Sequence, residues 1–216
     1  HWTHKQLWAD STMGAAAVAV AVADALEGDL SAGAVRALVK EPDVSYRLKL
    51  ILKYDVEPTV AERAMSAVYL AAGGNEEQLA KGLYAGWDGV CAMADGGLAI
   101  GSHTVSHPVL ARLDEPDLRI ELSESRSRLE AQTGREVRAL SYPFGRPWDV
   151  PEDIGRVAAS CGYTSGVTAL PGTNLANTDP FRLLRLDIDP GSEVAVMAAE
   201  GLGVLRRTGS MLGVNL

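Results

Sequence analysis

Two histidines stand four residues apart in the segment GSHTVSHP, at positions 103 and 107, and they are half of the four histidines in the chain. The segment follows an apolar run, residues 98–100, that is typical of a short buried strand. A neutral imidazole keeps one nitrogen lone pair with which it can bind zinc or a similar divalent ion. A turn between Gly101 and Pro108 would let His103 and His107 reach the same ion. The spacing therefore indicates a metal site, with surface or hydrogen-bonded histidines as the alternative interpretation.

The elements that would position these histidines alternate between strands and helices after residue 97. Helices are predicted from Pro116 to Gly134 and from Pro151 to Gly162, because proline favours a first helical turn and glycine favours a helix end. Strands that alternate with helices form a parallel sheet or barrel, with functional residues at the carboxyl ends of the strands. Apolar runs predict four such strands, at residues 98–100, 137–142, 163–170 and 183–188.

The first 95 residues are predicted to be mainly helical. The predicted helices cover residues 34–40, 59–72, 76–84 and 87–94, and Gly96-Gly97 supplies the signal that ends the last of them. The apolar run from Met13 to Ala23 reaches the charged Asp24 after eleven residues, whereas a membrane-spanning helix needs about 18 or more apolar residues. We therefore expect a buried helix there and no transmembrane segment. No export signal is visible, and both cytoplasm and cell envelope stay open as compartments.

The composition suits a globular protein. A chain of 216 residues with 47% apolar and 22% charged residues can build one domain with a sizeable core. The formal net charge of −8 argues against nucleic acid as a partner, because a phosphate backbone is bound chiefly by Lys and Arg. We predict a single domain over residues 1–216, with a mainly helical part over 1–95, a β/α part over 96–190 and a C-terminal helix over 191–216.

In its longer context the histidine segment resembles a known family. Residues 97–110, GLAIGSHTVSHPVL, resemble the second motif of the polysaccharide deacetylases, the NodB-homology enzymes of carbohydrate esterase family 4. About thirty residues later, residues 140–145, LSYPFG, resemble the third motif in its Tyr-Pro variant. Residues 121–134 match the helix that usually lies between the two motifs, and residues 181–187 are similar to a late strand of the same group.

The resemblance implies a distorted β/α barrel that hydrolyses an N- or O-acetyl group on a polysaccharide or oligosaccharide, with a divalent metal ion, zinc above all, as cofactor. In the family an Asp and two His hold the metal, which polarises water and the acetyl carbonyl. A backbone N–H of the third motif steadies the oxyanion. Carried over to this chain, His103 and His107 are metal ligands and Phe144 supplies the oxyanion N–H. Tyr142 and Pro143 would shape the floor of the substrate pocket.

Parts of the family's machinery have no counterpart in these 216 residues. The first family motif, of the Thr-Phe-Asp-Asp-Gly type, supplies a ligand Asp and the general base, and the chain contains no Asp-Asp pair. The family's general acid is a late His, and no histidine follows His107. We therefore expect a NodB-type barrel that is incomplete at its N-terminal strand and carries a helical insertion in its first half. Weak metal binding, impaired activity of the isolated chain, and association or domain swapping through exposed strand edges are further expectations.

Two charged residues of the last predicted strand could face the same pocket. Alternation along that strand puts Arg185 and Asp187 on one face and Leu184 and Leu186 on the other. One hypothesis is that Arg185 and Asp187 orient the substrate or the base; the alternative is an edge strand with solvated charges. For the whole chain, the alternative to an enzyme is a non-catalytic carbohydrate-binding or scaffold protein that keeps the deacetylase fold.

Overall fold

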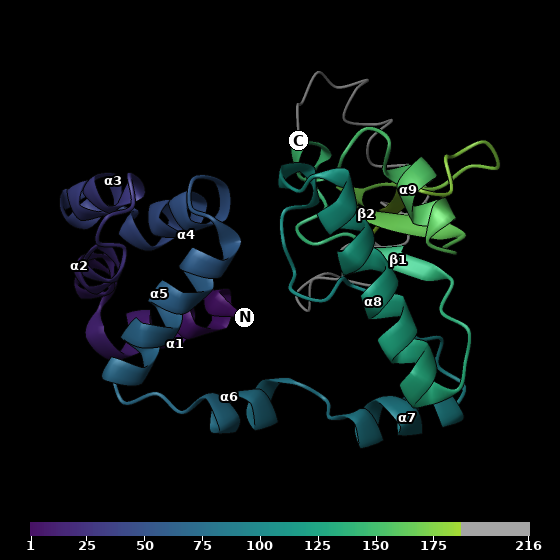
Figure 1. Cartoon of the computed structure of the whole chain (residues 1–216), viewed down its shortest axis with the longest axis horizontal. Helices are drawn as coiled ribbons and strands as arrows, with labels where there is room; N and C mark the ends of the chain where they lie inside the picture. Colours follow the sequence, from purple (N-terminus) through teal and green to yellow (C-terminus); the bar gives the residue numbers. More distant parts are fainter. Residues whose placement is uncertain (187–216) are drawn as a thin grey trace, which may run out of the picture. The chain divides into compact units, whose positions relative to one another are not determined.

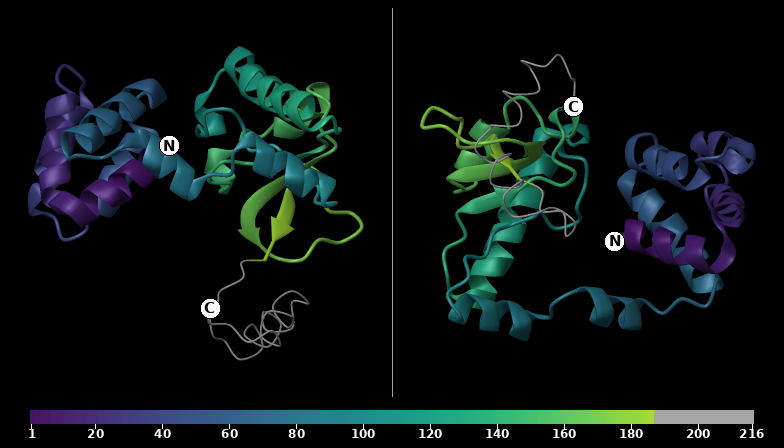
Figure 2. Two further views of the ribbon diagram at one scale, coloured as in Figure 1. Left: turned by 90° about the horizontal axis from the view of Figure 1, so that it is seen from below. Right: turned by 180° about the vertical axis from the view of Figure 1, so that it is seen from behind.

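The computed structural model describes residues 1–186 of the chain and divides it into two units (Figure 1 and Figure 2). The first unit is His1–Gly89 and the second begins at Val90, so that the boundary falls inside helix α7 (Trp87–Asp95). Each unit has its own hydrophobic core. The predicted single domain stays a prediction, and the predicted C-terminal helix over 191–216 lies outside the described residues.

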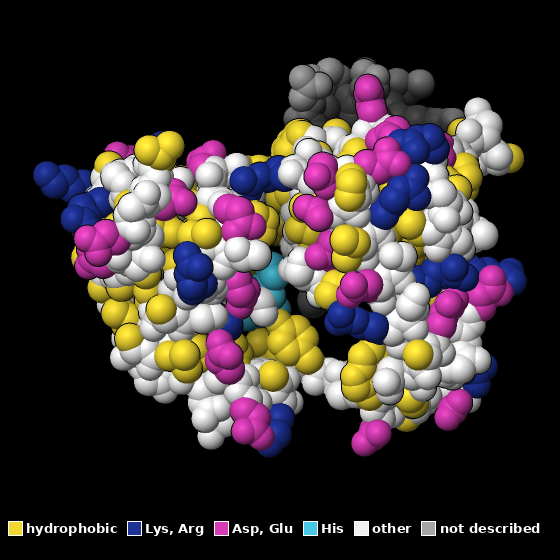
Figure 3. All heavy atoms as spheres, viewed as in Figure 1, with side chains coloured by type: hydrophobic (Ala, Val, Ile, Leu, Met, Phe, Trp, Pro, Cys, Tyr) yellow, Lys and Arg dark blue, Asp and Glu magenta, His cyan; other side chains and the backbone are white. Residues whose placement is uncertain are grey.

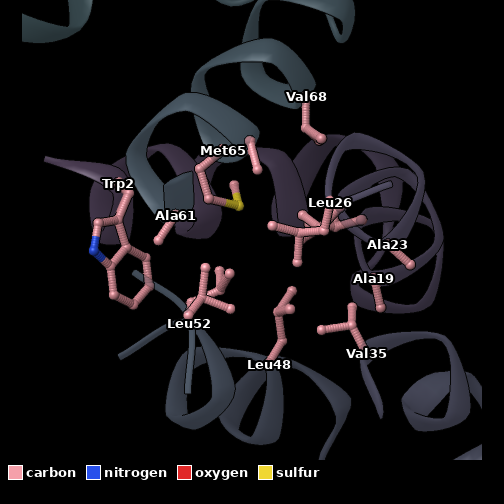
Figure 4. Packing of buried hydrophobic residues seen from close by; sticks show 14 of the residues in the cluster. Trp2, Ala19, Ala23, Leu26, Val35, Leu48, Leu52, Ala61, Met65 and Val68 are labelled. Atoms are coloured by element: carbon pink, nitrogen blue, oxygen red, sulfur yellow. The ribbon is translucent and has the colours of Figure 1, made fainter. Parts of the chain in front are cut away.

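The first unit is helical, as the sequence predicts. Helices α1, α2, α4 and α5 surround a core in which Leu26, Leu48, Leu52 and Met65 lie close together (Figure 4). The buried helix expected at residues 13–23 is α2, which contributes Val18 to this core. The elements are α1 (Trp2–Met13), α2 (Ala15–Ala25), α3 (Ser31–Ala37), η1 (Leu38–Lys40), α4 (Val44–Tyr54), α5 (Pro58–Ala71) and α6 (Glu76–Leu83).

Within residues 1–186, each helix is too short or too polar to cross a membrane.

The second unit combines helices with a parallel sheet. Its three strands lie in the order β1-β2-β3, and both pairings are parallel. Leu122 of α8 and Ile154 of α9 share a buried cluster with Leu140 of β1, which places both helices against the sheet. The elements are η2 (Leu110–Arg112), α8 (Glu115–Thr133), β1 (Ala139–Ser141), η3 (Pro147–Asp149), α9 (Ile154–Ser160), β2 (Ser165–Pro171) and β3 (Leu183–Arg185). The predicted mixed α/β class is confirmed, but the strands of the described part do not close a barrel.

Helix α8 begins and ends where its sequence signals predict. The side chain of Asp114 accepts a hydrogen bond from the amide of Asp117 at 2.9 Å, with Pro116 in the first turn. At the other end Gly134 has φ 65, and its amide donates to the carbonyl oxygen of Glu130 at 2.9 Å. Because both caps are made by residues next to the helix, the sequence alone defines this element.

Ion pairs connect α8 and α9 at the surface. Glu115 accepts hydrogen bonds from Arg156 at 2.9 Å and from Arg119 at 2.7 Å, and Figure 3 shows acidic and basic side chains side by side over the second unit. Arg156 and then Arg119 lower the pKa of Glu115 to about 2. The stabilising effect is therefore present above the ordinary carboxyl pKa and is lost as the pH falls through about 2. Solvent screening keeps it small.

The prediction of a strand at residues 98–100 is wrong. Gly97, with φ 89, ends α7, and the amide of Leu98 donates back to the carbonyl oxygen of Met93 at 3.0 Å. This is the hydrogen bond of a Schellman helix end, so the first residue of the apolar run completes the helix and does not enter the sheet. Parallel pairing with β1 starts only at Ser102, as an isolated bridge.

The core of the first unit gives a stability prediction. Leu48 is fully buried, so Leu48→Ala should lower the free energy of unfolding by about 2–5 kcal/mol through lost contacts and a cavity. Leu7→Ala is the matched control, because Leu7 of α1 is 64% exposed and its loss should change stability by about 0.5 kcal/mol or less. Urea unfolding followed by circular dichroism measures both. Equal effects of the two substitutions would contradict the described core.

Candidate functional site

The two sequence motifs lie at the carboxyl ends of neighbouring strand segments. The amide of Ser102 donates to the carbonyl oxygen of Ala139 at 2.8 Å, and the amide of Ser141 donates to the carbonyl oxygen of Ser102 at 2.9 Å. His103 follows the first segment directly, and residues 142–145 follow the second. Because the carboxyl ends of parallel strands share one edge of a sheet, this pairing brings the histidine segment beside the Tyr-Pro-Phe-Gly turn.

Three rings gather at this edge. The ring centroids of His103 and His107 are 4.8 Å apart with an interplanar angle of 77°, and the Phe144 ring lies 4.8 Å from that of His107. The Nδ1–H of His103 donates to the carbonyl oxygen of Ser141 at 2.7 Å. Since Nδ1 carries the hydrogen, the lone pair of a neutral His103 is on Nε2. A backbone carbonyl that fixes the tautomer and orientation of an imidazole is the usual outer partner of a metal-binding histidine.

The separation of the two rings fits two ligands of one metal ion. With Zn–N bonds of about 2.0–2.1 Å and tetrahedral angles, two imidazole ligands place their centroids about 5 Å apart, and the observed separation is 4.8 Å. Among residues 1–186, His, Cys, Asp and Glu form no group of three or more that could hold a metal ion. The described residues thus offer two of the three protein ligands that a catalytic zinc site normally has.

The histidine loop has an unusual backbone. Thr104 and His107 have positive φ values, 67° and 60°, although neither is a glycine. The hydroxyl of Thr104 accepts a hydrogen bond from the amide of His107 at 3.1 Å, which closes the loop from inside. From outside, the carboxylate of Glu121 on α8 accepts hydrogen bonds from the amides of Val105 and Ser106 at 2.7 and 2.9 Å. Left-handed residues of this kind persist only where surrounding contacts impose them.

Glu121 belongs to the helix predicted between the motifs, and its sequence position alone indicates no role. A signal was available one helical turn later, where the polar Ser125 lies on the apolar side of the same helix. Ser125 is buried, and its hydroxyl is 2.8 Å from that of Ser102. Positions 121 and 125 are neighbours on a helix surface, so a polar edge made of Glu121 and Ser125 faces the residues around His103.

Phe144 lies at the centre of a tight turn. Its φ is 60°, and across it the amide of Gly145 donates to the carbonyl oxygen of Pro143 at 2.6 Å, as in a three-residue turn. The turn aims the Phe144 ring at His107. A positive φ on a bulky residue is rare and is often found at functional sites. The predicted oxyanion residue is therefore brought next to a predicted metal ligand.

Tyr142 precedes this turn and Pro143 begins it. Both are buried, and Tyr142 is only 3% exposed. The hydroxyl of Tyr142 donates to the carbonyl oxygen of Phe181 at 2.7 Å, and burial raises the pKa of Tyr142 well above its ordinary value. Its phenol is accordingly protonated, and its hydrogen bond is made within the protein. This placement allows Tyr142 to form a floor beneath the site, but not to make a direct polar contact with substrate.

The two predicted residues of the last strand have different outcomes. Arg185 is exposed at the end of β3, and its carbonyl oxygen accepts a hydrogen bond from Gly172 at 3.0 Å. Asp187 lies outside the described residues. Their role in orienting substrate stays a prediction.

The turn gives a second stability prediction. Gly145 has φ 64, and a Cβ added there would lie 2.5 Å from the amide nitrogen of Ala169, which donates to the Gly145 carbonyl oxygen. Gly145→Ala should therefore lower the free energy of unfolding by more than the left-handed conformation alone costs, about 1–2 kcal/mol. Gly97→Ala is the control, because Gly97 has φ 89 and no atom within 4 Å of an added Cβ. If urea unfolding gave equal losses, the close approach at Ala169 would be contradicted.

Comparison with known proteins places the chain in a family. A family model described as polysaccharide deacetylase matches residues 54–166, just over half of the chain. The candidate polysaccharide deacetylase YxkH of Bacillus subtilis (strain 168) is 29% identical over 107 residues, which cover 50% of this chain and 37% of YxkH. The chain thus spans little more than a third of the length of this curated relative.

Solved structures of deacetylases are also similar. A polysaccharide deacetylase from Bacillus cereus is 25% identical with a TM-score of 0.46, over 53% of this chain and 35% of that one. The Streptococcus pyogenes deacetylase PplD in complex with acetate is 18% identical with a TM-score of 0.47, over 82% of each chain. TM-scores below 0.5 add no weight to the fold assignment. The family match, which includes both the histidine loop and the Tyr-Pro-Phe-Gly turn, shows that the chain belongs to the polysaccharide deacetylase family.

Proposed function

We propose that the protein removes acetyl groups, from nitrogen or oxygen, from a polysaccharide or oligosaccharide with the help of a divalent metal ion, zinc above all. Membership of the polysaccharide deacetylase family supports the deacetylation itself. The observation that supports metal binding is the pair of imidazole rings 4.8 Å apart, one of them oriented by the Ser141 carbonyl.

His103 and His107 are the residues that would hold the ion. A divalent ion held there would act as a Lewis acid toward the acetyl carbonyl and lower the pKa of a water molecule. The protein's own part is to orient the ligands: the Ser141 carbonyl fixes the tautomer of His103, and the Phe144 ring packs edge-on against His107. Both contacts would keep the Nε2 lone pair of His103 and the His107 ring in place before the ion arrives.

The Tyr-Pro-Phe-Gly turn is proposed to serve the acetyl group. In the hydrolysis, water adds to the carbonyl carbon, the C–N or C–O bond to the sugar breaks, and acetate and the free amine or hydroxyl leave. Negative charge develops on the carbonyl oxygen, and the N–H of Phe144 is proposed to donate to it. Tyr142 and Pro143 are proposed to shape the floor of the pocket, and Arg185 and Asp187 are proposed to orient the saccharide.

Zinc titration of the full chain tests the metal site. His103→Ala and His107→Ala should each reduce the zinc association constant by more than the roughly 10–100-fold that is lost with an outer-shell partner, since each removes a ligand. His4→Ala is the control, because His4 belongs to the first unit and contacts Tyr84. Isothermal titration calorimetry measures all four chains. Equal zinc affinity of the two site variants and the wild type would contradict the proposed metal site.

Acetate release tests the activity. The wild-type chain is incubated with an N-acetylated and an O-acetylated oligosaccharide before and after chelation, and again after zinc is restored. We expect slow release, because residues 1–186 offer two imidazoles without a third ligand. Release that stops on chelation, returns with zinc and is lost in His103→Ala supports the proposal. Release that survives chelation would overturn the metal dependence. Saccharide binding without acetate release, with or without zinc, would favour the non-catalytic carbohydrate-binding alternative.

A further inference from the structure

One carboxylate supports the backbone of the histidine loop from outside. One oxygen of Glu121 accepts hydrogen bonds from the amides of Val105 and Ser106 at 2.7 and 2.9 Å, and the other accepts from the Ser106 hydroxyl at 2.5 Å. All three donors belong to the two residues between Thr104 and His107. The carboxylate therefore holds the middle of the segment that separates the two histidines.

Packing contributes little to the shape of this loop. Ser102 and Pro108 are buried, but none of residues 103–107 between them is, and Val105 is 40% exposed. Two of these residues also have the left-handed backbone that side chains disfavour. A mostly exposed loop with disfavoured dihedrals needs directional contacts to populate one conformation. The three hydrogen bonds to Glu121 are contacts of that kind.

Helix α8, which carries Glu121, is fixed in place by the core. Leu118 and Leu122, the neighbours of Glu121 on α8, are buried against β1, and Ser125 binds Ser102 one turn further on. The carboxylate thus projects from a helix whose backbone is held by the core and not by the loop. Carboxylate acceptors also make stronger hydrogen bonds to amides than neutral acceptors do.

We propose that Glu121 is a positioning residue that sets the separation of His103 and His107 and, through it, the affinity of the pair for a divalent metal ion. The inference rests on the metal site of the proposed function. Glu121 acts through the loop backbone, where its oxygens accept hydrogen bonds, and among residues 1–186 it does not form a group of three with His103 and His107 that could hold a metal ion.

Substitutions at position 121 separate hydrogen bonding from charge. Glu121→Ala removes all three bonds. Glu121→Gln keeps one oxygen for the two amides and offers its NH2 group to the Ser106 hydroxyl, so it should rescue the loop. Glu124→Ala is the matched control, because Glu124 lies three residues later on α8 and pairs with Arg128 on the exposed side. Ser106→Ala removes one bond only, and it keeps the test decisive if Glu121→Ala does not fold.

Three measurements are made on each full chain. Amide hydrogen exchange of Val105 and Ser106 reports the loop, the nuclear Overhauser effect between the His103 and His107 rings reports their separation, and calorimetric titration with zinc alone reports the affinity. In Glu121→Ala we expect exchange at least about 10-fold faster, a weakened ring–ring signal and zinc affinity lower by about 10-fold or more, the size of an outer-shell loss. Ser106→Ala should show smaller changes in the same direction, Glu121→Gln should lie closer to the wild type than to Glu121→Ala because a neutral acceptor makes weaker bonds, and Glu124→Ala should match the wild type.

Two outcomes would overturn the inference. Glu121→Ala with unchanged exchange and an unchanged ring–ring signal would show that the loop holds its shape without the carboxylate. Faster exchange with unchanged zinc affinity would show that the loop is held by Glu121 but that this does not set the metal site. Failure of the proposed function is distinguishable from both: the wild-type chain would then bind no zinc, while the metal-free exchange and ring signals would still decide whether Glu121 sets the separation of the histidines.

Discussion

The candidate site depends on a short parallel pairing between Ser102 and the strand β1. Two backbone hydrogen bonds, of 2.8 and 2.9 Å, join Ser102 to Ala139 and Ser141. Because the pairing is parallel, both segments leave the sheet at the same edge, and the next residue of each segment belongs to one of the two family motifs. Without this pairing the His103 imidazole would not contact the Ser141 carbonyl, and the two motifs would not lie at one site.

The two units are stabilised by different kinds of contact. The first unit is held by fully buried side chains from several helices, such as Leu48 and Leu52, and its stability follows from apolar burial. The site of the second unit is built from partly exposed loops with left-handed residues, where burial offers little. Polar contacts stabilise these loops instead. Glu121 accepts hydrogen bonds from the histidine loop, and the Pro143 carbonyl closes the turn at Phe144. Such contacts fix geometry, which is what a ligand pair requires.

The family assignment and the described site agree on location but differ in completeness. The matched range, residues 54–166, contains both imidazoles and the Tyr-Pro-Phe-Gly turn. Within residues 1–186, a carboxylate does not join those two imidazoles in a group that could hold a metal ion. Two imidazoles bind a divalent ion more weakly than a complete set of three ligands. The exact separation of the two rings then matters more, and this is the quantity that Glu121 is proposed to control.

The sequence by itself determined the local features of this protein. Pro116 and Gly134 define α8, Gly97 ends α7, and the histidine spacing and the Tyr-Pro-Phe-Gly segment indicate the family, because each signal lies within a few neighbouring residues. Only the tertiary structure decided which segments pair. Leu98 completes a helix where a strand was predicted, and the sheet of residues 1–186 has three strands, not a closed barrel. The partners of the histidine loop, the Ser141 carbonyl and the Glu121 carboxylate, were decided there too. A backbone carbonyl has no residue-type signature, and a contact between residues 16 or 38 positions apart exists only once the chain has folded.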